Sequence, residues 1–218
     1  MNSGKSTALL QAAFNYEERD QQVLVAKPQI DTKGEAFIVS RLGVTRRVDF
    51  TVAPDEDIYV AFTRERERVL KERGVDVSCL LVDEAQFLTE GQVDDLLRIA
   101  IQESVPVLAY GIRTDFQTVA FPGSRRLLEI AHSLEELKTI CRCGRKAMFN
   151  ARLVDGVFVF DGDQVAIDTS SELSARHVVS YESLCGACYL EESGGVLNNG
   201  WRAKVDFSYT GAPDADFS

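Results

Sequence analysis

The first residues of the chain have the chemistry of a phosphate-binding loop. Gly4-Lys5-Ser6-Thr7 matches the second half of the pattern G-x-x-x-x-G-K-[ST], whose first glycine is absent. In that loop the glycine lets the backbone approach a phosphate, the lysine reaches the β- and γ-phosphates, and the serine hydroxyl binds Mg²⁺. Apolar residues follow at helical spacing, and such a helix directs free N–H groups at the anion. A chance match is the alternative interpretation.

Two adjacent carboxylates, Asp83 and Glu84, follow a continuous apolar run at 77–82. Such a run is typical of a central strand in a parallel sheet. P-loop enzymes place a second Mg²⁺-binding carboxylate at the end of such a strand. Asp83 fits that role, which leaves Glu84 free to act as a base. The alternative is that both carboxylates only cap the strand at a solvated loop.

Four of the five cysteines form two close pairs, Cys141 with Cys143 and Cys185 with Cys188. Four thiolates in two hairpin turns suit a closed tetrahedral Zn²⁺ site. Disulfides are the alternative, which an intracellular environment disfavours. Cys79 lies inside the apolar run and is interpreted as a core residue.

The elements that must position these groups alternate along the chain. Apolar runs predict strands at 22–26, 77–82, 105–110 and 137–140. Helices are predicted at 55–73 (ended by Gly74), 89–101 (with a Thr89–Gln92 capping box) and 124–131. This order predicts an α/β fold: a P-loop NTPase-like, mostly parallel sheet with helices on both faces. Ligands in such folds bind beyond the carboxyl ends of the strands, so 83–87 and 111–121 are the expected site.

The segment between the cysteine pairs alternates apolar and polar residues at 157–160 and 165–167, which predicts a hairpin or two short strands. A small zinc-binding β unit would therefore follow the P-loop domain. The predicted boundaries are 1–140 for the P-loop domain, 141–190 for the zinc unit and 191–218 for a polar C-terminal tail.

Composition restricts the class of protein. The 218 residues include 24 basic and 34 acidic side chains, for a net charge of −10. An acidic chain is a poor candidate for coating nucleic acid, because phosphate binding requires clustered Lys and Arg. The sequence has no apolar run of the roughly 20 residues needed to span a membrane and no signal peptide, so we expect no membrane partner and a cytoplasmic location.

Taken together, these features resemble the type II, zinc-containing thymidine kinase family. The matching segments follow one order along most of the chain: NSGKST at 2–7, KPQID at 27–31, VSRLG at 39–43, LLVDEAQFL at 80–88, YGIRTDF at 110–116, LKTICRCGRKA at 137–147 and YESLCGACY at 181–189.

The resemblance implies a kinase domain with a small zinc-held lasso domain, and transfer of the γ-phosphoryl group of ATP to the 5′-hydroxyl of thymidine. It implies Glu84 as the catalytic base, with ATP, Mg²⁺ and structural Zn²⁺ as cofactors and a homotetramer as the assembly. Residues implied to bind ATP and Mg²⁺ are Asn2, Ser3, Gly4, Lys5, Ser6, Thr7, Asp83, Glu84, Ala85 and Gln86. Residues implied to bind the nucleoside are Phe87, Phe116, Phe121 and Tyr181, and Arg152 matches a basic position of the family.

The chain departs from the family pattern in three places. The first glycine and first strand are absent, and Met1 matches an internal methionine of the family, which favours a true start further upstream. Lys33 replaces an arginine, so a charge is kept without the bidentate fork. The segment 168–180, which contains His177, is long and lacks the family's Gly-Gly turn.

Three other functions remain open at this point. The motif DEAQ at 83–86 resembles acidic motifs of helicases, so a nucleic-acid-dependent ATPase is one alternative, although such enzymes need a second large domain and a basic face. A non-catalytic zinc module and a kinase of another nucleoside, such as deoxyuridine, are the others.

Overall fold

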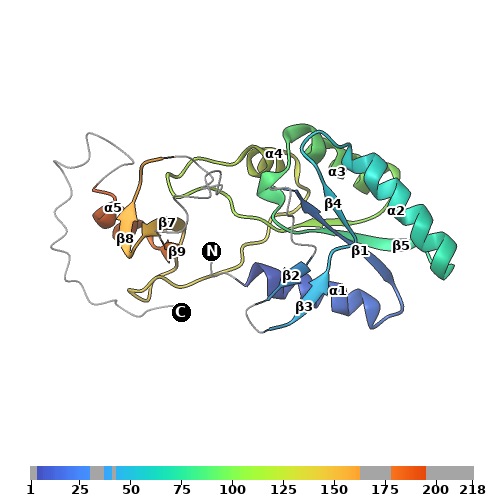
Figure 1. Ribbon diagram of the computed structural model, residues 1–218, viewed down its shortest axis with the longest axis horizontal. Helices are drawn as coiled ribbons and strands as arrows, with labels where there is room; N and C mark the ends of the chain where they lie inside the picture. Colours follow the sequence, from blue (N-terminus) through green and yellow to red (C-terminus); the bar gives the residue numbers. More distant parts are fainter. Residues whose placement is uncertain (1–3, 30–36, 41–42, 163–177, 195–218) are drawn as a thin grey trace, which may run out of the picture.

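A four-stranded parallel sheet, here called the main sheet, forms the centre of the larger part of the molecule (Figure 1). The computed structural model describes residues 4–29, 37–40, 43–162 and 178–194. The strands lie in the order β4 (Phe50–Val52), β1 (Gln22–Pro28), β5 (Val77–Val82) and β6 (Val107–Ala109). All three pairings are parallel, so the predicted α/β class is confirmed.

The two central strands carry runs of buried apolar residues, at 23–26 in β1 and 79–82 in β5, because both faces of the main sheet are covered. Val23 and Val25 of β1 pack in one cluster with α1 (Lys5–Glu17). Leu24 and Ala26 point to the opposite face and pack with α2 (Ile58–Arg73) and α3 (Glu90–Gln102). Successive strand residues alternate between faces, so a strand buried on both sides needs an unbroken apolar run. The helices therefore lie on both faces, as predicted.

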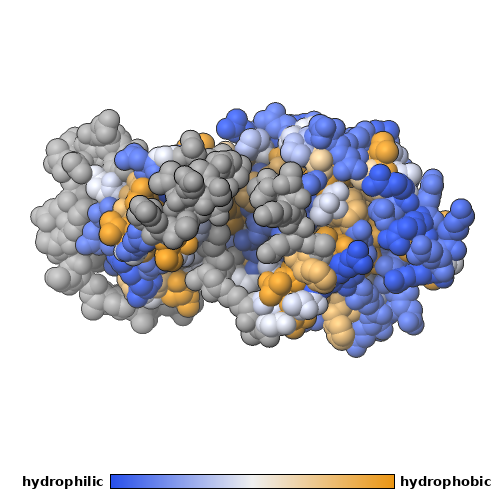
Figure 2. Space-filling view, viewed as in Figure 1, coloured by the Kyte–Doolittle hydropathy of each residue, from blue (hydrophilic) through white to orange (hydrophobic). Residues whose placement is uncertain are grey.

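Local signals in the sequence set the ends of the helices. Asp57 caps α2 by accepting a hydrogen bond from the Val60 N–H at 3.0 Å, so the helix begins three residues later than the predicted start at 55. Gly74 ends it with φ +70°. The Thr89–Gln92 capping box is present at the start of α3. Figure 2 shows hydrophilic residues covering the end of the molecule formed by α2.

Some predicted elements are wrong or shorter. The strand predicted at 137–140 does not form: Ile140 makes one isolated bridge to Lys146 and is 73% exposed. A short apolar run becomes a strand only beside a neighbour that accepts its hydrogen bonds, and no described strand lies beside this segment. The strand predicted at 105–110 shortens to β6, and the helix predicted at 124–131 is α4 (Pro122–Ile130).

Two hairpins were not predicted. The first joins β2 (Phe37–Val39) to β3 (Thr45–Arg47). The second joins β7 (Phe149–Val154) to β8 (Val157–Val159) through Asp155-Gly156, both with positive φ. An Asp-Gly turn between short apolar runs is a strong hairpin signal, so this second hairpin could have been found from sequence.

A second antiparallel sheet, here called the small sheet, is built around that hairpin in the order β8-β7-β9. Its third strand is β9 (Val179–Leu184), and α5 (Gly186–Glu192) follows directly. Of the predicted segment 157–160, residues 157–159 pair with β7, whereas 165–167, the other half of the predicted hairpin, lies outside the described residues. Among the described residues, no helix is both long and apolar enough to cross a membrane.

Candidate active site

The phosphate-binding motif lies where α1 begins, in the middle of the molecule and on the side of the main sheet nearest the small sheet (Figure 1). Gly4 has φ +72°, a conformation that glycine adopts without strain, and its carbonyl accepts the Ala8 N–H at 2.9 Å. Lys5, Ser6 and Thr7 form the first helical turn, whose N–H groups have no helical partners. Asn2 and Ser3 lie outside the described residues.

Asp83 lies at the carboxyl end of β5 and is 4% exposed. Its backbone N–H donates to the Ala26 carbonyl at 3.0 Å, and its carboxylate accepts the Glu84 N–H at 3.0 Å. Burial, followed by the charge of Glu84, raises the pKa of Asp83, whereas the charges of Lys27 and Lys5 lower it. Lys5 and Lys27 therefore lie close enough to Asp83 for their charges to act on its carboxylate.

Lys27 belongs to the segment KPQID at 27–31, for which the sequence predicts no binding role. It lies at the end of β1, directly after the residue that pairs with Val82. The sequence could have indicated this residue. Lys27 follows a buried strand, and the carboxyl ends of parallel strands share one edge of the sheet, so its side chain is expected near the acidic motif.

Glu84 has φ +50° and ψ +37°, a left-handed conformation that is rare for a residue with a side chain. The side-chain amide of Gln86 donates to the Glu84 carboxylate. The other end of that amide accepts the Ile112 N–H at 3.2 Å, which ties the acidic motif to the loop after β6. Strain of this kind costs about 1–3 kcal/mol and concentrates at functional sites.

Two glycines missed by the sequence analysis fit closely around the short helix η1 (Ala85–Phe87). A Cβ on Gly123 would lie 2.6 Å from the Ala85 carbonyl oxygen and 2.7 Å from that of Leu88. A Cβ on Gly111 would lie 2.9 Å from the Gln86 Oε1 atom. Position 123 therefore requires glycine for the acidic motif to keep its place, whereas a side chain at position 111 would press on the Gln86 amide.

Two of the predicted nucleoside-binding aromatics form a pair beside the acidic motif. The rings of Phe87 and Phe121 lie 5.4 Å apart at 76°, an edge-to-face contact. Both line a pocket of about 580 Å³, together with Leu88, Thr89 and Pro122 among others. A flat, uncharged ring is the kind of group that such a wall can hold.

The other two aromatics lie elsewhere. Phe116 is 1% exposed, does not line this pocket, and has the Arg152 guanidinium 3.9 Å above its ring. Tyr181 of β9 pairs in register with Arg152 of β7, so the two side chains share one face of the small sheet. Arg152, the predicted basic position, thus lies over Phe116 and has Tyr181 as its neighbour on the adjacent strand.

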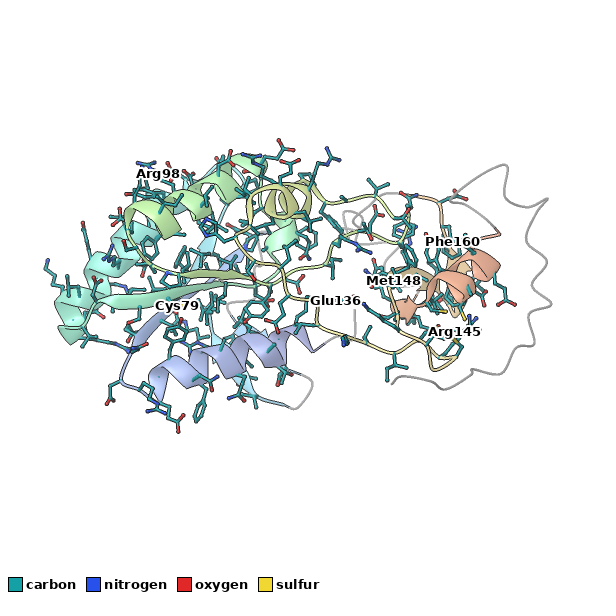
Figure 3. The ribbon with its side chains drawn as sticks, turned by 180° about the vertical axis from the view of Figure 1, so that it is seen from behind. Cys79, Arg98, Glu136, Arg145, Met148 and Phe160 are labelled. Atoms are coloured by element: carbon teal, nitrogen blue, oxygen red, sulfur yellow. The ribbon has the colours of Figure 1, made fainter. Side chains whose placement is uncertain are left out.

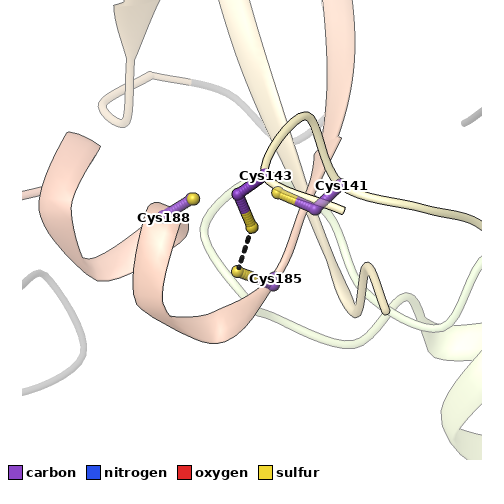
Figure 4. A group of neighbouring side chains, drawn as sticks. All are labelled: Cys141, Cys143, Cys185 and Cys188. Carbon is purple, nitrogen blue, oxygen red and sulfur yellow. Dashed lines mark hydrogen bonds between the residues drawn. The ribbon is translucent and has the colours of Figure 1, made fainter. Parts of the chain in front are cut away.

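The four paired cysteines converge although 42 residues separate Cys143 from Cys185 (Figure 4). Their sulfur atoms all lie within 4.8 Å of one another, and Cys143 Sγ is 3.5 Å from Cys185 Sγ. Zn–S bonds of about 2.3 Å in a tetrahedron place sulfurs about 3.8 Å apart, so the cluster fits zinc.

The thiols of this cluster differ in pKa. Burial alone would raise the pKa of Cys141, but the N–H groups of Cys143 and Cys185 and the neighbouring thiols hold it down to about 6. Burial and the other three thiols raise the pKa of Cys188 to about 12. A divalent cation would relieve that crowding of thiolates.

Only the first cysteine pair lies in a tight turn, closed by Gly144 with φ +87°. The prediction of a second hairpin turn is wrong: Cys185 is the N-cap of α5 and Cys188 lies on its first turn. Residues three apart share a helix face, which brings both sulfurs to the same side.

The fifth cysteine, Cys79, lies in the main sheet, away from the cluster (Figure 3). It is fully buried, and burial raises its pKa to about 11. Its interpretation as a core residue is confirmed.

Comparison with known proteins gives a consistent result. The family model described as thymidine kinase matches residues 1–189. The chain is 48% identical to a thymidine kinase of Legionella pneumophila over 184 residues, which is 84% of this chain and 85% of that protein. It is 46% identical to the thymidine kinase of Enterobacteria phage T4 over 77% and 84% of the two chains. It is also 42% identical to that of Haemophilus influenzae over 90% and 95%.

Proposed function

The chain belongs to the thymidine kinase family, and we propose that it transfers the γ-phosphoryl group of ATP to the 5′-hydroxyl of thymidine. One observation carries the residue assignments: the buried Asp83 and the strained Glu84 lie at the carboxyl end of β5, where the charges of Lys27 and Lys5 act on Asp83. The alternative of a nucleic-acid-dependent ATPase has no support from the relatives.

Glu84 is proposed as the catalytic base. Its carboxylate accepts a hydrogen bond from the side-chain amide of Gln86, which lines the pocket together with Phe87 and Phe121. A nucleoside stacked in that pocket would present its 5′-hydroxyl to Glu84, which takes the proton as the oxygen attacks phosphorus. The backbone strain at Glu84 supports this assignment, because the carboxylate's direction depends on it.

The phosphates are proposed to bind at the start of α1. The free N–H groups of the first turn, the Lys5 ammonium and the Ser6 hydroxyl form an anion site there. Asp83 is the buried carboxylate that would hold Mg²⁺, which neutralises charge on the transferring phosphoryl group. Lys27 adds a second positive charge at the same edge.

Several finer assignments are part of the same proposal. The P-loop domain would span 1–140 and the zinc unit 141–190, with 191–218 as a tail. Tyr181 would contact the nucleoside from the small sheet; the segment 163–177 lies outside the described residues. A homotetramer and a cytoplasmic location stay predictions, as does the preference for thymidine over deoxyuridine.

The test is phosphorylation of thymidine and deoxyuridine by ATP and Mg²⁺, comparing the wild type with Glu84→Gln. Removing a general base lowers turnover by about 10²–10⁴-fold, whereas ATP affinity should change little. Glu67→Gln is the matched control, because Glu67 is exposed on α2. Wild-type turnover in Glu84→Gln would show that Glu84 is not the base, and ATP consumption without a phosphorylated nucleoside would contradict the proposed reaction.

A further inference from the structure

The loop between β6 and α4, residues 113–121, carries Phe116 and is closed by its own hydrogen bonds. The Asp115 carboxylate accepts the N–H groups of Gln117 and Val119, each at 2.8 Å. Thr114 forms a bridge with Ala120. The loop is therefore a compact unit, whose position depends on what holds it from outside.

The small sheet holds this loop on one side. Asn150 of β7 donates to the Thr114 carbonyl at 3.2 Å. Two residues further along the same strand, the Arg152 guanidinium covers the Phe116 ring. Alternate residues of a strand face the same way, so one face of β7 is directed at the loop.

The chain after β8 holds the same loop by its backbone. The Gln117 side-chain amide donates to the carbonyls of Phe160 at 3.0 Å and Gly162 at 3.1 Å. Figure 3 shows Phe160 beside α5.

One contact links the loop directly to the cysteine cluster. Tyr189 follows Cys188 on α5, is fully buried, and donates its hydroxyl to the Phe116 carbonyl at 2.5 Å. Its ring packs 5.0 Å from that of Phe149 and 5.3 Å from that of Phe160, so the side chain has little freedom. A shift of α5 would therefore move the Phe116 backbone.

We propose that Tyr189 is a positioning residue, which couples the cysteine cluster to the loop that carries Phe116 and so tunes nucleoside affinity. The proposal deepens the proposed function and rests on it for its kinetic consequence. It predicts that the zinc unit acts on the nucleoside side of the reaction, because the contacts of Tyr189 and Gln117 join that unit to the loop that carries Phe116.

Tyr189→Phe tests the proposal, because it keeps the ring and removes only the hydroxyl. Leaving a buried carbonyl without its donor should raise the KM and Kd for thymidine about tenfold, equivalent to about 1.4 kcal/mol. The KM for ATP, the kcat and the zinc content should stay within about twofold of wild type. Hydrogen exchange of the amides in 114–120 should become faster by a similar factor.

The matched control is Tyr59→Phe, which removes a hydroxyl in the first turn of α2 that donates to Glu103 at the end of α3. It should leave exchange in 114–120 and the thymidine KM unchanged. A second variant, Gln117→Ala, loosens the loop from its own side without touching α5, and should also raise the thymidine KM and speed exchange.

The possible results separate the two proposals. Unchanged exchange and unchanged thymidine KM in Tyr189→Phe would overturn the positioning role. Loss of zinc or of folding in Tyr189→Phe, together with wild-type behaviour of Gln117→Ala, would reduce Tyr189 to a structural part of the zinc unit and also overturn it. Faster exchange in both variants, with no thymidine phosphorylation by the wild type, would support the coupling and contradict the proposed function.

Discussion

The main sheet and the small sheet bury very different amounts of apolar side chain. The strands β1 and β5 are covered on both faces, and their central residues are fully buried in two separate clusters. The cluster beneath the small sheet contains six buried residues, two of which are cysteines. Small units cannot bury enough surface to offset the entropy of ordering the chain, so they need a cross-link or a metal.

This difference also separates the two halves of the site. The proposed phosphate side is built on elements whose position the apolar core fixes. The proposed nucleoside side includes Phe116 and Tyr181, whose placement depends on the small sheet and therefore on its four cysteines. We therefore expect the two substrates to respond to different perturbations.

The largest expected effect follows from breaking the cysteine cluster with Cys185→Ser. Structural zinc supplies most of the folding free energy of small metal-bound units, so the small sheet should lose its packing. We expect loss of bound zinc. We also expect the KM for thymidine to rise about tenfold or more, and to rise by a larger factor than the KM for ATP. Metal analysis and the two KM values measure this.

Cys79→Ala is the matched control for that experiment. It removes a thiol from the main sheet, so zinc content should be unchanged while stability falls by roughly 1 kcal/mol. Unchanged zinc content in Cys185→Ser would show that Cys185 is not a ligand.

A smaller effect is expected from Gly123→Ala in the main domain. The added methyl would collide with backbone oxygens of Ala85 and Leu88, so η1 must shift. We expect a cost of about 1–3 kcal/mol in unfolding free energy, with reduced turnover and full zinc content. Urea unfolding measures the unfolding free energy, and a kinetic assay measures the turnover.

Gly91→Ala controls for the methyl group itself, since its Cβ would meet nothing within 4 Å in α3. A helical glycine replaced by alanine should stabilise by about 0.5–1 kcal/mol. If both glycine variants showed the same unfolding free energy, the close fit around η1 would not contribute to stability.

The smallest expected effect is the pH dependence contributed by Asp49, which supports β1 through a hydrogen bond from the Val25 N–H at 2.7 Å. Burial raises the pKa of Asp49, while that hydrogen bond and the charge of Arg46 lower it. An acid with a raised folded pKa favours folding at low pH, and this advantage is lost as pH rises to the folded pKa. Asp49→Asn should therefore raise the melting temperature at pH 7, by at most about 4 °C, and flatten its pH dependence between pH 4 and 7.

Asp76→Asn is expected to change the melting temperature at pH 7 in the opposite direction. The hydrogen bonds from Arg66 lower the pKa of Asp76, so its stabilisation is present at neutral pH and lost as pH falls through the folded pKa. This variant should melt slightly below wild type at pH 7. A lower melting temperature for Asp49→Asn at pH 7 would instead show that the hydrogen bond needs the ionised carboxylate.

The sequence by itself determined the elements with strong local signals. The apolar runs of β1 and β5, the capping box of α3 and the Gly74 stop of α2 all appear as predicted, because side-chain pattern and helix ends are local properties. The motifs also predicted the family, and the cysteines predicted a cluster that fits zinc. The Asp-Gly hairpin was available from sequence and was missed.

Tertiary structure decided what depends on neighbours distant in sequence. The run at 137–140 forms no strand because no described strand pairs with it, and Cys185 caps a helix instead of a turn. Gly123 matters only because η1 packs against it, and Lys27 because β1 lies beside β5. The hydroxyl of Tyr189 reaches Phe116 across 73 residues of chain, a contact that no periodicity or spacing encodes because it exists only after both sheets have packed.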